Sequence, residues 1–286
     1  MLDPHIPLPA FNSATKYPSI PTYHPLGDRG VLQPHQDGFF ESLRSYTVSE
    51  KLDGTNVRII TLPALHRGDT GDYFIGTREN LVHARGDRVF NPDQGAVEGV
   101  RYLADRYIDH PQRWGKGLVI YGELYGGRIN AAGNYTDDPN KTAFRVFDVM
   151  VMDAKFHATL STGDPRKIAA WRDGLESGVL GQTFLNTIEL DKFCAEFGFT
   201  QVPNLTSDGQ DLLPWSIDDT AKWLRRRLDK TKASITEKNH GTPEGVVVRA
   251  PDRSRIYKIR FEDYDRTLKQ GRFAPKINRP RGSQAQ

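Results

Sequence analysis

The segment Glu50–Asn56, with the sequence EKLDGTN, places a lysine directly before an expected tight turn. Lys51 follows an expected strand over 46–50, and the dipeptide Asp53-Gly54 favours a turn. A lysine amine becomes a nucleophile only after it loses its proton, and desolvation or nearby cations make that loss easier. Taken alone, however, a lysine beside an Asp-Gly turn is more often an ordinary solvated residue.

Five short motifs downstream give this lysine more weight. They are Thr77–Asn80 (TREN), Tyr121–Leu124 (YGEL), Phe147–Asp148 (FD), Glu244–Arg249 (EGVVVR) and Tyr257–Arg260 (YKIR). In the last motif, Lys258 and Arg260 are two positions apart on one expected strand, so they face the same side. Both can therefore reach one phosphate group and act as the cations beside the amine of Lys51.

The types and order of these motifs resemble the covalent nucleotidyltransferase superfamily, which includes ATP-dependent DNA ligases, RNA ligases and mRNA capping enzymes. The resemblance extends from about Tyr46 to Phe261. It is closest to the RNA ligase 2 family, because Asn56 stands where DNA ligases and capping enzymes usually carry an arginine. The resemblance implies an α+β nucleotidyltransferase (ATP-grasp-like ligase) fold. It also implies an ATP-dependent RNA ligase that joins 3′-OH and 5′-phosphate ends with Mg²⁺ or Mn²⁺.

The same resemblance assigns expected roles to individual residues. Lys51 would attack the α-phosphorus of ATP, expel pyrophosphate and carry AMP until it passes to a 5′-phosphate end. Lys258 and Arg260 would assist this catalysis, and Glu244 would hold the metal ion. Phe147 would stack on adenine, and Arg78 would contact ribose or the donor-end phosphate. The complete set expected to bind the nucleotide is Glu50, Asp53, Gly54, Asn56, Arg78, Glu123, Phe147 and Arg249.

Several of these residues also have simpler interpretations. Phe147 lies in an apolar run and could be a core residue, and Arg78 could be an ordinary surface arginine. Glu123 follows an apolar run, and a buried carboxylate there would need a partner such as a ribose hydroxyl or a metal. Arg260 departs from the family pattern, which usually has a lysine. The positive charge is retained, but an arginine cannot donate a proton at neutral pH.

The elements that must position these residues form an α+β pattern. Strands are expected over 46–50, 57–62, 73–77, 118–124, 144–152, 245–249 and 256–260, and helices over 96–109, 191–197 and 217–228. The first two strands would form a hairpin around the Asp53-Gly54 turn. Because strands and helices are interspersed without regular βαβ alternation, we expect largely antiparallel sheet.

Three parts are expected along the chain. Residues 1–44 contain six prolines within the first 25 positions, which predicts an extended arm packed on the core. Residues 45–261 would form the nucleotidyltransferase domain, and 262–286 a short basic tail rather than a separate C-terminal domain. The tail could follow a nucleic-acid backbone with Arg266, Lys269, Arg272, Lys276, Arg279 and Arg281. Sealing would then depend on the tail, on the arm or on an accessory protein.

Composition narrows the class of protein. The chain has 286 residues, a formal net charge of +3 and one cysteine, Cys194, so a disulfide framework is excluded. No apolar run reaches the roughly 20 residues that cross a bilayer, and no secretory signal is visible, so we expect a cytoplasmic protein without a membrane partner. The small net charge means that any surface contacting nucleic acid must be local.

The expected partner is RNA, as nicked duplexes or single-stranded ends, with RNA/DNA hybrids as a further possibility. Three alternatives stay open at this point. An ATP-dependent DNA ligase and a capping-type guanylyltransferase share the motifs, and GTP is not excluded as the nucleotide. A nonenzymatic RNA-binding protein could retain the fold, although it would have no need for the lysine, Glu244 and both cations together.

Overall fold

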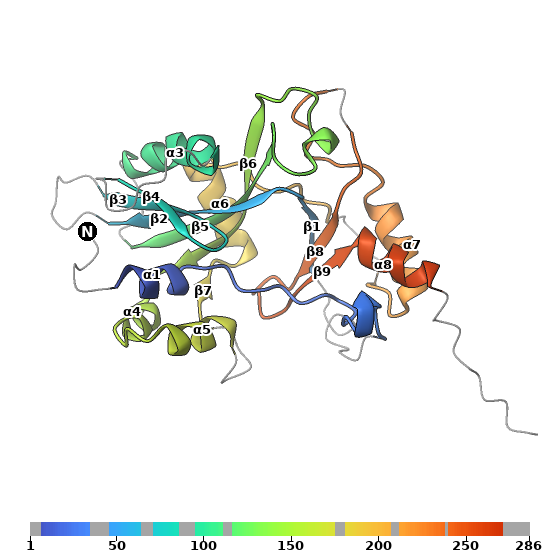
Figure 1. The fold of residues 1–286 in the computed structure, drawn as a ribbon, viewed down its shortest axis with the longest axis horizontal. Coiled ribbons are helices and arrows are strands. Elements are labelled where there is room, and N and C mark those ends of the chain that lie inside the picture. The colour runs from blue at the N-terminus through green and yellow to red at the C-terminus, as the bar shows by residue number, and fades with distance from the viewer. Residues whose placement is uncertain are drawn as a thin grey trace, which may run out of the picture.

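The computed structural model describes residues 7–34, 46–63, 71–85, 95–110, 116–174, 181–206, 212–237 and 240–270. Two antiparallel sheets organise this part of the chain (Figure 1). The strands are β1 (Thr47–Lys51), β2 (Thr55–Leu62), β3 (Asp72–Thr77), β4 (Leu81–Ala84), β5 (Leu118–Gly126), β6 (Thr142–Val151), β7 (Thr183–Phe184), β8 (Gly245–Arg249) and β9 (Ile256–Arg260). The large sheet has the order β4-β3-β2-β5-β6-β7, and the small sheet has the order β1-β8-β9.

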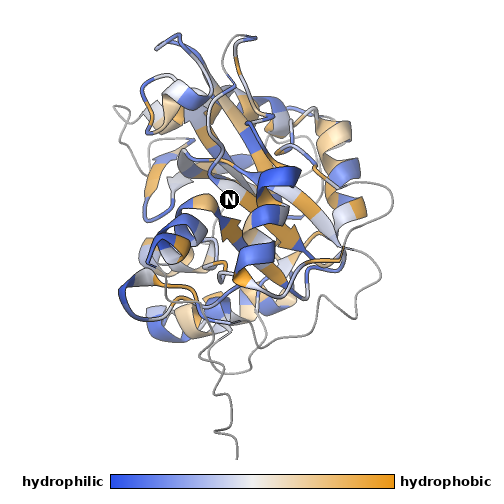
Figure 2. Ribbon diagram, turned by 90° about the vertical axis from the view of Figure 1, so that its right-hand side faces the viewer, coloured by the Kyte–Doolittle hydropathy of each residue, from blue (hydrophilic) through white to orange (hydrophobic). Residues whose placement is uncertain are grey.

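Helices cover both faces of the large sheet (Figure 1). One face packs against α3 (Gly95–Ile108) and α6 (Thr187–Phe197), and the other against α1 (Leu8–Ala14), α4 (Ala154–Leu160) and α5 (Pro165–Asp173). Figure 2 shows orange, hydrophobic segments along strands inside the molecule, whereas the helices alternate between blue and orange. Because helices cover both faces, the central strands β2 and β5 are buried at nearly every position.

Among the described residues, the helices α7 (Ile217–Arg227) and α8 (Phe261–Lys269) cover one face of the small sheet. Val48, Val246, Val248 and Ile259 point into the hydrophobic cluster with these helices. Because side chains alternate along a strand, the intervening residues of β1, β8 and β9 point the other way, towards the large sheet. That second face forms the floor of the candidate site.

Most of the predicted elements are confirmed. The strands β8 and β9 have the predicted ends, the other predicted strands and helices differ by a few residues at their ends, and all pairings within the two sheets are antiparallel. Helix α7 is capped at its N-terminus, because Ser216 Oγ accepts a hydrogen bond from Asp219 N at 3.0 Å. The predicted hairpin is wrong: β1 pairs with β8 in the small sheet, whereas β2 lies in the large sheet.

The two ends of the chain also differ from the sequence expectation. The predicted extended arm is wrong over α1, where Phe11 is completely buried against the large sheet. At the other end, the predicted tail begins as α8, which includes Arg266 and Lys269. Arg272, Lys276, Arg279 and Arg281 lie outside the described residues. Within the described ranges, no helix has the length and apolar character needed to cross a membrane.

Candidate active site between the two sheets

A cavity of about 580 Å³ lies between the small sheet and the large sheet. Its floor includes Ser49 and Lys51 from β1, Val247 from β8 and Lys258 from β9. The pairing of Ser49 with Val247, and of Val247 with Lys258, places these three in one row across the small sheet. Alternation along the strands thus brings the two predicted lysines to the same cavity, although they are far apart in sequence.

Lys51 ends β1 and forms an ion pair with Glu244, which directly precedes β8. The Lys51 Nζ atom donates a hydrogen bond to Glu244 Oε2 at 2.5 Å, and both side chains are largely shielded from solvent. The register explains the meeting, because Lys51 is paired with Gly245. The lysine and glutamate that the motifs single out are therefore direct partners.

Glu123 on β5 adds a second carboxylate to this part of the cavity. Removal from water raises the pKa of Glu123 to about 8; the positive charge of Lys51 opposes this rise, and the negative charge of Glu244 adds to it. Desolvation likewise raises the pKa of Glu244, again opposed by Lys51. Acids with raised pKa values in a cavity are typical of functional sites.

The turn after Lys51 depends on close backbone packing. A Cβ atom on Gly54 would lie 2.4 Å from Leu124 O and 2.9 Å from Tyr125 Cβ, so only glycine fits beside β5. The N–H of Asp53 donates a hydrogen bond to the hydroxyl of Tyr135 at 2.8 Å. The structure therefore explains the glycine at position 54 by the close approach of this turn to the neighbouring strand β5.

Asn56 and Phe147 line the wall formed by the large sheet. The Oδ1 atom of Asn56 is buried and has no hydrogen-bond partner among the described residues. A buried acceptor without a donor is unfavourable, so this atom is a candidate contact for a bound ligand. Phe147 is partly buried against the hydrophobic cluster under α1, and it also lines the cavity. The interpretation as a core residue is therefore partly confirmed, and stacking of Phe147 on adenine stays a prediction.

Of the four predicted cations besides Lys51, three line the cavity and one does not. Lys258, Arg249 and Arg78 belong to its lining, and the Arg78 side chain is 71% exposed. Burial lowers the pKa of Lys258, and the positive charges of Arg260 and Lys51 lower it further. Arg260 instead donates two hydrogen bonds to Asp263 at the start of α8, at 2.8 and 2.9 Å.

The side chain of Glu50 is engaged within the protein. Glu50 is 1% exposed, and its carboxylate accepts hydrogen bonds from Thr231 Oγ1 at 2.5 Å and Lys232 N at 2.7 Å. It therefore anchors the segment that follows α7, on the side of β1 opposite to Lys51. A direct contact between this carboxylate and a nucleotide stays a prediction.

Several lining residues were not identified from the sequence. Tyr17, Pro18, Ser19 and Ile20 belong to the wall. Gln201 and Asn204 also line the cavity, and they form isolated bridges with β6 and β1. No motif marked them, because short segments without periodicity carry little signal about long-range contacts. The six prolines of the first 25 residues indicated packing on the core, but not which surface the segment would cover.

A divalent ion would need ligands beyond the protein at this site. Among the described residues, no three His, Cys, Asp or Glu side chains are grouped so that they could hold a metal ion. Mg²⁺ is commonly bound by one or two carboxylates together with substrate phosphates. Glu244 and Glu123 beside Lys51 fit that arrangement, in which the phosphates of a bound nucleotide would supply the remaining ligands.

Residues 44–269 match the family model described as RNA ligase. Among curated proteins, none matches the chain. Solved structures of an RNA ligase from Naegleria gruberi are similar at low identity. A variant without ligand has 14% identity and a TM-score of 0.49, covering 89% of this chain and 62% of that one. The pyrophosphate-bound form has 17% identity and a TM-score of 0.46, covering 79% and 52%. The chain therefore spans between about half and two thirds of these proteins.

Proposed function

The chain belongs to the RNA ligase family, and from this premise we propose that it joins RNA 3′-OH and 5′-phosphate ends through a covalent lysyl-AMP on Lys51. One observation carries the proposal: Lys51 and Lys258 line a single cavity that also contains Glu244 and Glu123. A nucleophilic amine, a second cation for phosphate and carboxylates for a divalent ion are the groups that nucleotidyl transfer requires.

The proposed reaction has three steps, with ATP as the nucleotide. The neutral Lys51 Nζ atom forms a bond to the α-phosphorus and releases a proton to solvent, the bond from that phosphorus to the bridging oxygen breaks, and pyrophosphate leaves. A terminal 5′-phosphate oxygen of RNA then attacks the phosphorus of the bound AMP and forms a 5′–5′ phosphoanhydride, while the phosphorus–nitrogen bond breaks and Lys51 takes up a proton from solvent. Finally, the 3′-OH attacks the 5′-phosphorus, its proton passes to solvent, and AMP leaves.

The residues around the cavity support particular roles in this reaction. Glu244 holds the amine of Lys51 at the end of β1, and Glu123 lies beside the pair. Lys258, on the same floor, would bind the phosphate that Lys51 attacks. Mg²⁺ or Mn²⁺ held by Glu244, when bound, would neutralise charge on the phosphates. The unpartnered Asn56 Oδ1 atom would accept a hydrogen bond from the nucleotide.

Labelling of the polypeptide tests the first step. The protein is incubated with Mg²⁺ and ATP labelled at the α-phosphate, and in parallel with labelled GTP. We expect acid-labile label from ATP, loss of label in Lys51→Ala, and full label in Lys222→Ala, a control on the exposed side of α7. Label that persists in Lys51→Ala would contradict the proposed intermediate, and label from GTP alone would favour a guanylyltransferase.

Sealing assays test the substrate. Nicked duplexes whose 3′-OH strand is RNA are compared with all-DNA nicks and with single-stranded RNA ends, using protein that has already been adenylylated. We expect joining with an RNA 3′-OH strand. Equal or better joining of all-DNA nicks would identify a DNA ligase instead. Adenylylation without any joining would show that sealing requires a further chain or segment, and it would contradict the proposed ligase activity of this chain alone.

A further inference from the structure

The N-terminal segment 8–23, here called the strap, contacts three parts of the candidate site. It lies before the residues 44–269 that match the family model. Figure 1 shows it running from α1, below the large sheet, towards β9 in the small sheet. Residues 17–20 of the strap form part of the cavity wall itself.

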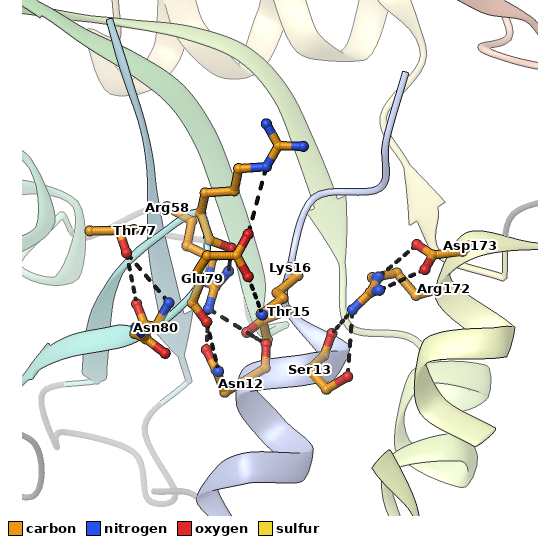
Figure 3. A network of polar contacts seen from close by, with 11 residues as sticks. Asn12, Ser13, Thr15, Lys16, Arg58, Thr77, Glu79, Asn80, Arg172 and Asp173 are labelled. Atoms are coloured by element: carbon orange, nitrogen blue, oxygen red, sulfur yellow. Dashed lines mark hydrogen bonds and ion pairs between the residues drawn. The ribbon is translucent and has the colours of Figure 1, made fainter. Parts of the chain in front are cut away.

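The first contact is with the turn after β3, which includes Arg78 and Glu79. Figure 3 shows Glu79 beside Asn12 and Lys16 of the strap. Asn12 Nδ2 donates a hydrogen bond to Glu79 O at 3.0 Å, and Lys16 Nζ donates to Glu79 Oε2 at 2.7 Å. The fully buried Arg58 donates to Arg78 O at 3.3 Å and also to Asn12 Oδ1. The strap thus anchors the turn from which Arg78 extends to the cavity.

The second contact is between Tyr17 and Phe147. The edge of one ring meets the other, with centroids 5.0 Å apart and an angle of 72° between the planes. The Tyr17 hydroxyl donates a hydrogen bond to Asp148 Oδ2 at 2.9 Å and accepts one from Arg253 at 2.9 Å. The ring also packs on Tyr121 at 4.9 Å. Tyr17 is therefore fixed on several sides, and its ring packs against Phe147.

The third contact is with the strand that carries Lys258. Lys258 N donates a hydrogen bond to Pro21 O at 2.9 Å, and Tyr23 N donates to Lys258 O at 3.0 Å. Thr22 and Lys258 form a parallel bridge, so the strap adds a short pairing to the open edge of β9. The position of Lys258 in the cavity floor thus depends on the strap as well as on β8.

We propose that the strap contributes to nucleotide binding as one wall of the site. In this proposal Tyr17 is a positioning residue, which holds the Phe147 ring for stacking on the base. The inference rests on the proposed function, since it takes the nucleotide to be the ligand of this cavity. Edge-to-face aromatic pairs are directional, so loss of the Tyr17 ring frees Phe147 to turn away from the base. Binding of the nucleotide then weakens, whereas the reacting groups around Lys51 stay in place.

Kinetics of adenylylation test this inference. For Tyr17→Leu we expect a KM for ATP about 3- to 10-fold higher, the range typical of one lost aromatic pair, and a kcat within about twofold of the wild type. Tyr17→Phe keeps the ring and should restore the KM to within about twofold. Ser19→Trp places a bulky ring at an exposed position of the cavity wall, so it should raise the KM without disturbing the core.

Tyr102→Leu is the matched control, because Tyr102 is 62% exposed on α3 and is not part of the cavity lining. Thermal melting shows whether each variant is folded. If Tyr17→Leu does not fold, the KM of Ser19→Trp alone tests the role of the strap. An unchanged KM in the folded variants, or an equal rise in Tyr102→Leu, overturns the role of the strap while the wild type still acquires label. If the wild type acquires no label from any nucleotide, the proposed function has failed first, and the inference fails with it.

Discussion

Replacing Glu123 with glutamine should change how the stability of the protein depends on pH. The pKa of Glu123 is raised from 4.5 to about 8 because the carboxyl group is removed from water, with Lys51 opposing the rise and Glu244 adding to it. Between these two pH values the folded chain keeps a proton at Glu123 that the unfolded chain has released. The free energy of unfolding therefore decreases as the pH rises from about 4.5, and this loss is complete above about 8.

The size of the effect follows from the same pKa difference. Each pH unit between the folded and unfolded pKa values contributes about 1.4 kcal/mol, so the upper limit is about 5 kcal/mol. Glu123 keeps some contact with solvent, so we expect about 2 to 4 kcal/mol. Glutamine resembles the neutral form and does not titrate. Glu123→Gln should thus match the wild type near pH 5 and become relatively more stable by that amount above pH 8.

Urea denaturation of the free protein from pH 5 to pH 9 measures this difference. Glu98→Gln, at an exposed position of α3, controls for the exchange of glutamate for glutamine. Its stability should run parallel to that of the wild type across the whole range. If Glu123→Gln also runs parallel, the carboxyl group is not desolvated in solution as it is in the structure, and the reasoning about the electrostatics of the cavity is refuted.

Two further predictions concern residues that shape the site. Gly54→Ala should lower the free energy of unfolding by about 1 to 3 kcal/mol in urea denaturation, because the new Cβ would overlap the backbone of β5. Gly95→Ala is the control and should not lower the free energy of unfolding, because its new Cβ would meet nothing within 4 Å. Asp148→Asn should lower the free energy of unfolding by about 3 to 5 kcal/mol, because two buried arginines lose their carboxylate partner. Asp218→Asn, at an exposed position, should lower it by less than about 1 kcal/mol. Equal effects of Asp148→Asn and Asp218→Asn would contradict the importance of the buried pairs.

The strands of the candidate site could be predicted because their signal is local. In EGVVVR and YKIR, runs of β-branched and alternating residues predicted β8 and β9 with their observed ends. The same alternation placed Lys258 and Arg260 on one face, and the structure adds that Asp263 engages Arg260 while Lys258 faces the cavity. The match to the RNA ligase family model confirms the resemblance that these motifs carried.

The N-terminal segment was harder to predict, for a reason specific to proline. Pro7 and Pro9 indicated extended chain, but they stand at the N-cap and in the first turn of α1. Proline is tolerated there because the N–H groups of the first turn have no partner within the helix. What stabilises this short helix is the burial of Ala10, Phe11 and Ala14 against the large sheet, which no local pattern of the segment reveals.

By itself, the sequence determined the residue types of the site, the strands that carry them and the face of each strand on which they lie. Only the tertiary structure decided that β1 and β2 separate into different sheets, that Lys51 meets Glu244, and that the strap closes one wall of the cavity. The physical reason is the distance along the chain over which each kind of signal acts. Alternation and turn propensity act over a few neighbouring residues, whereas sheet partners and cavity walls depend on which distant apolar surfaces are buried together.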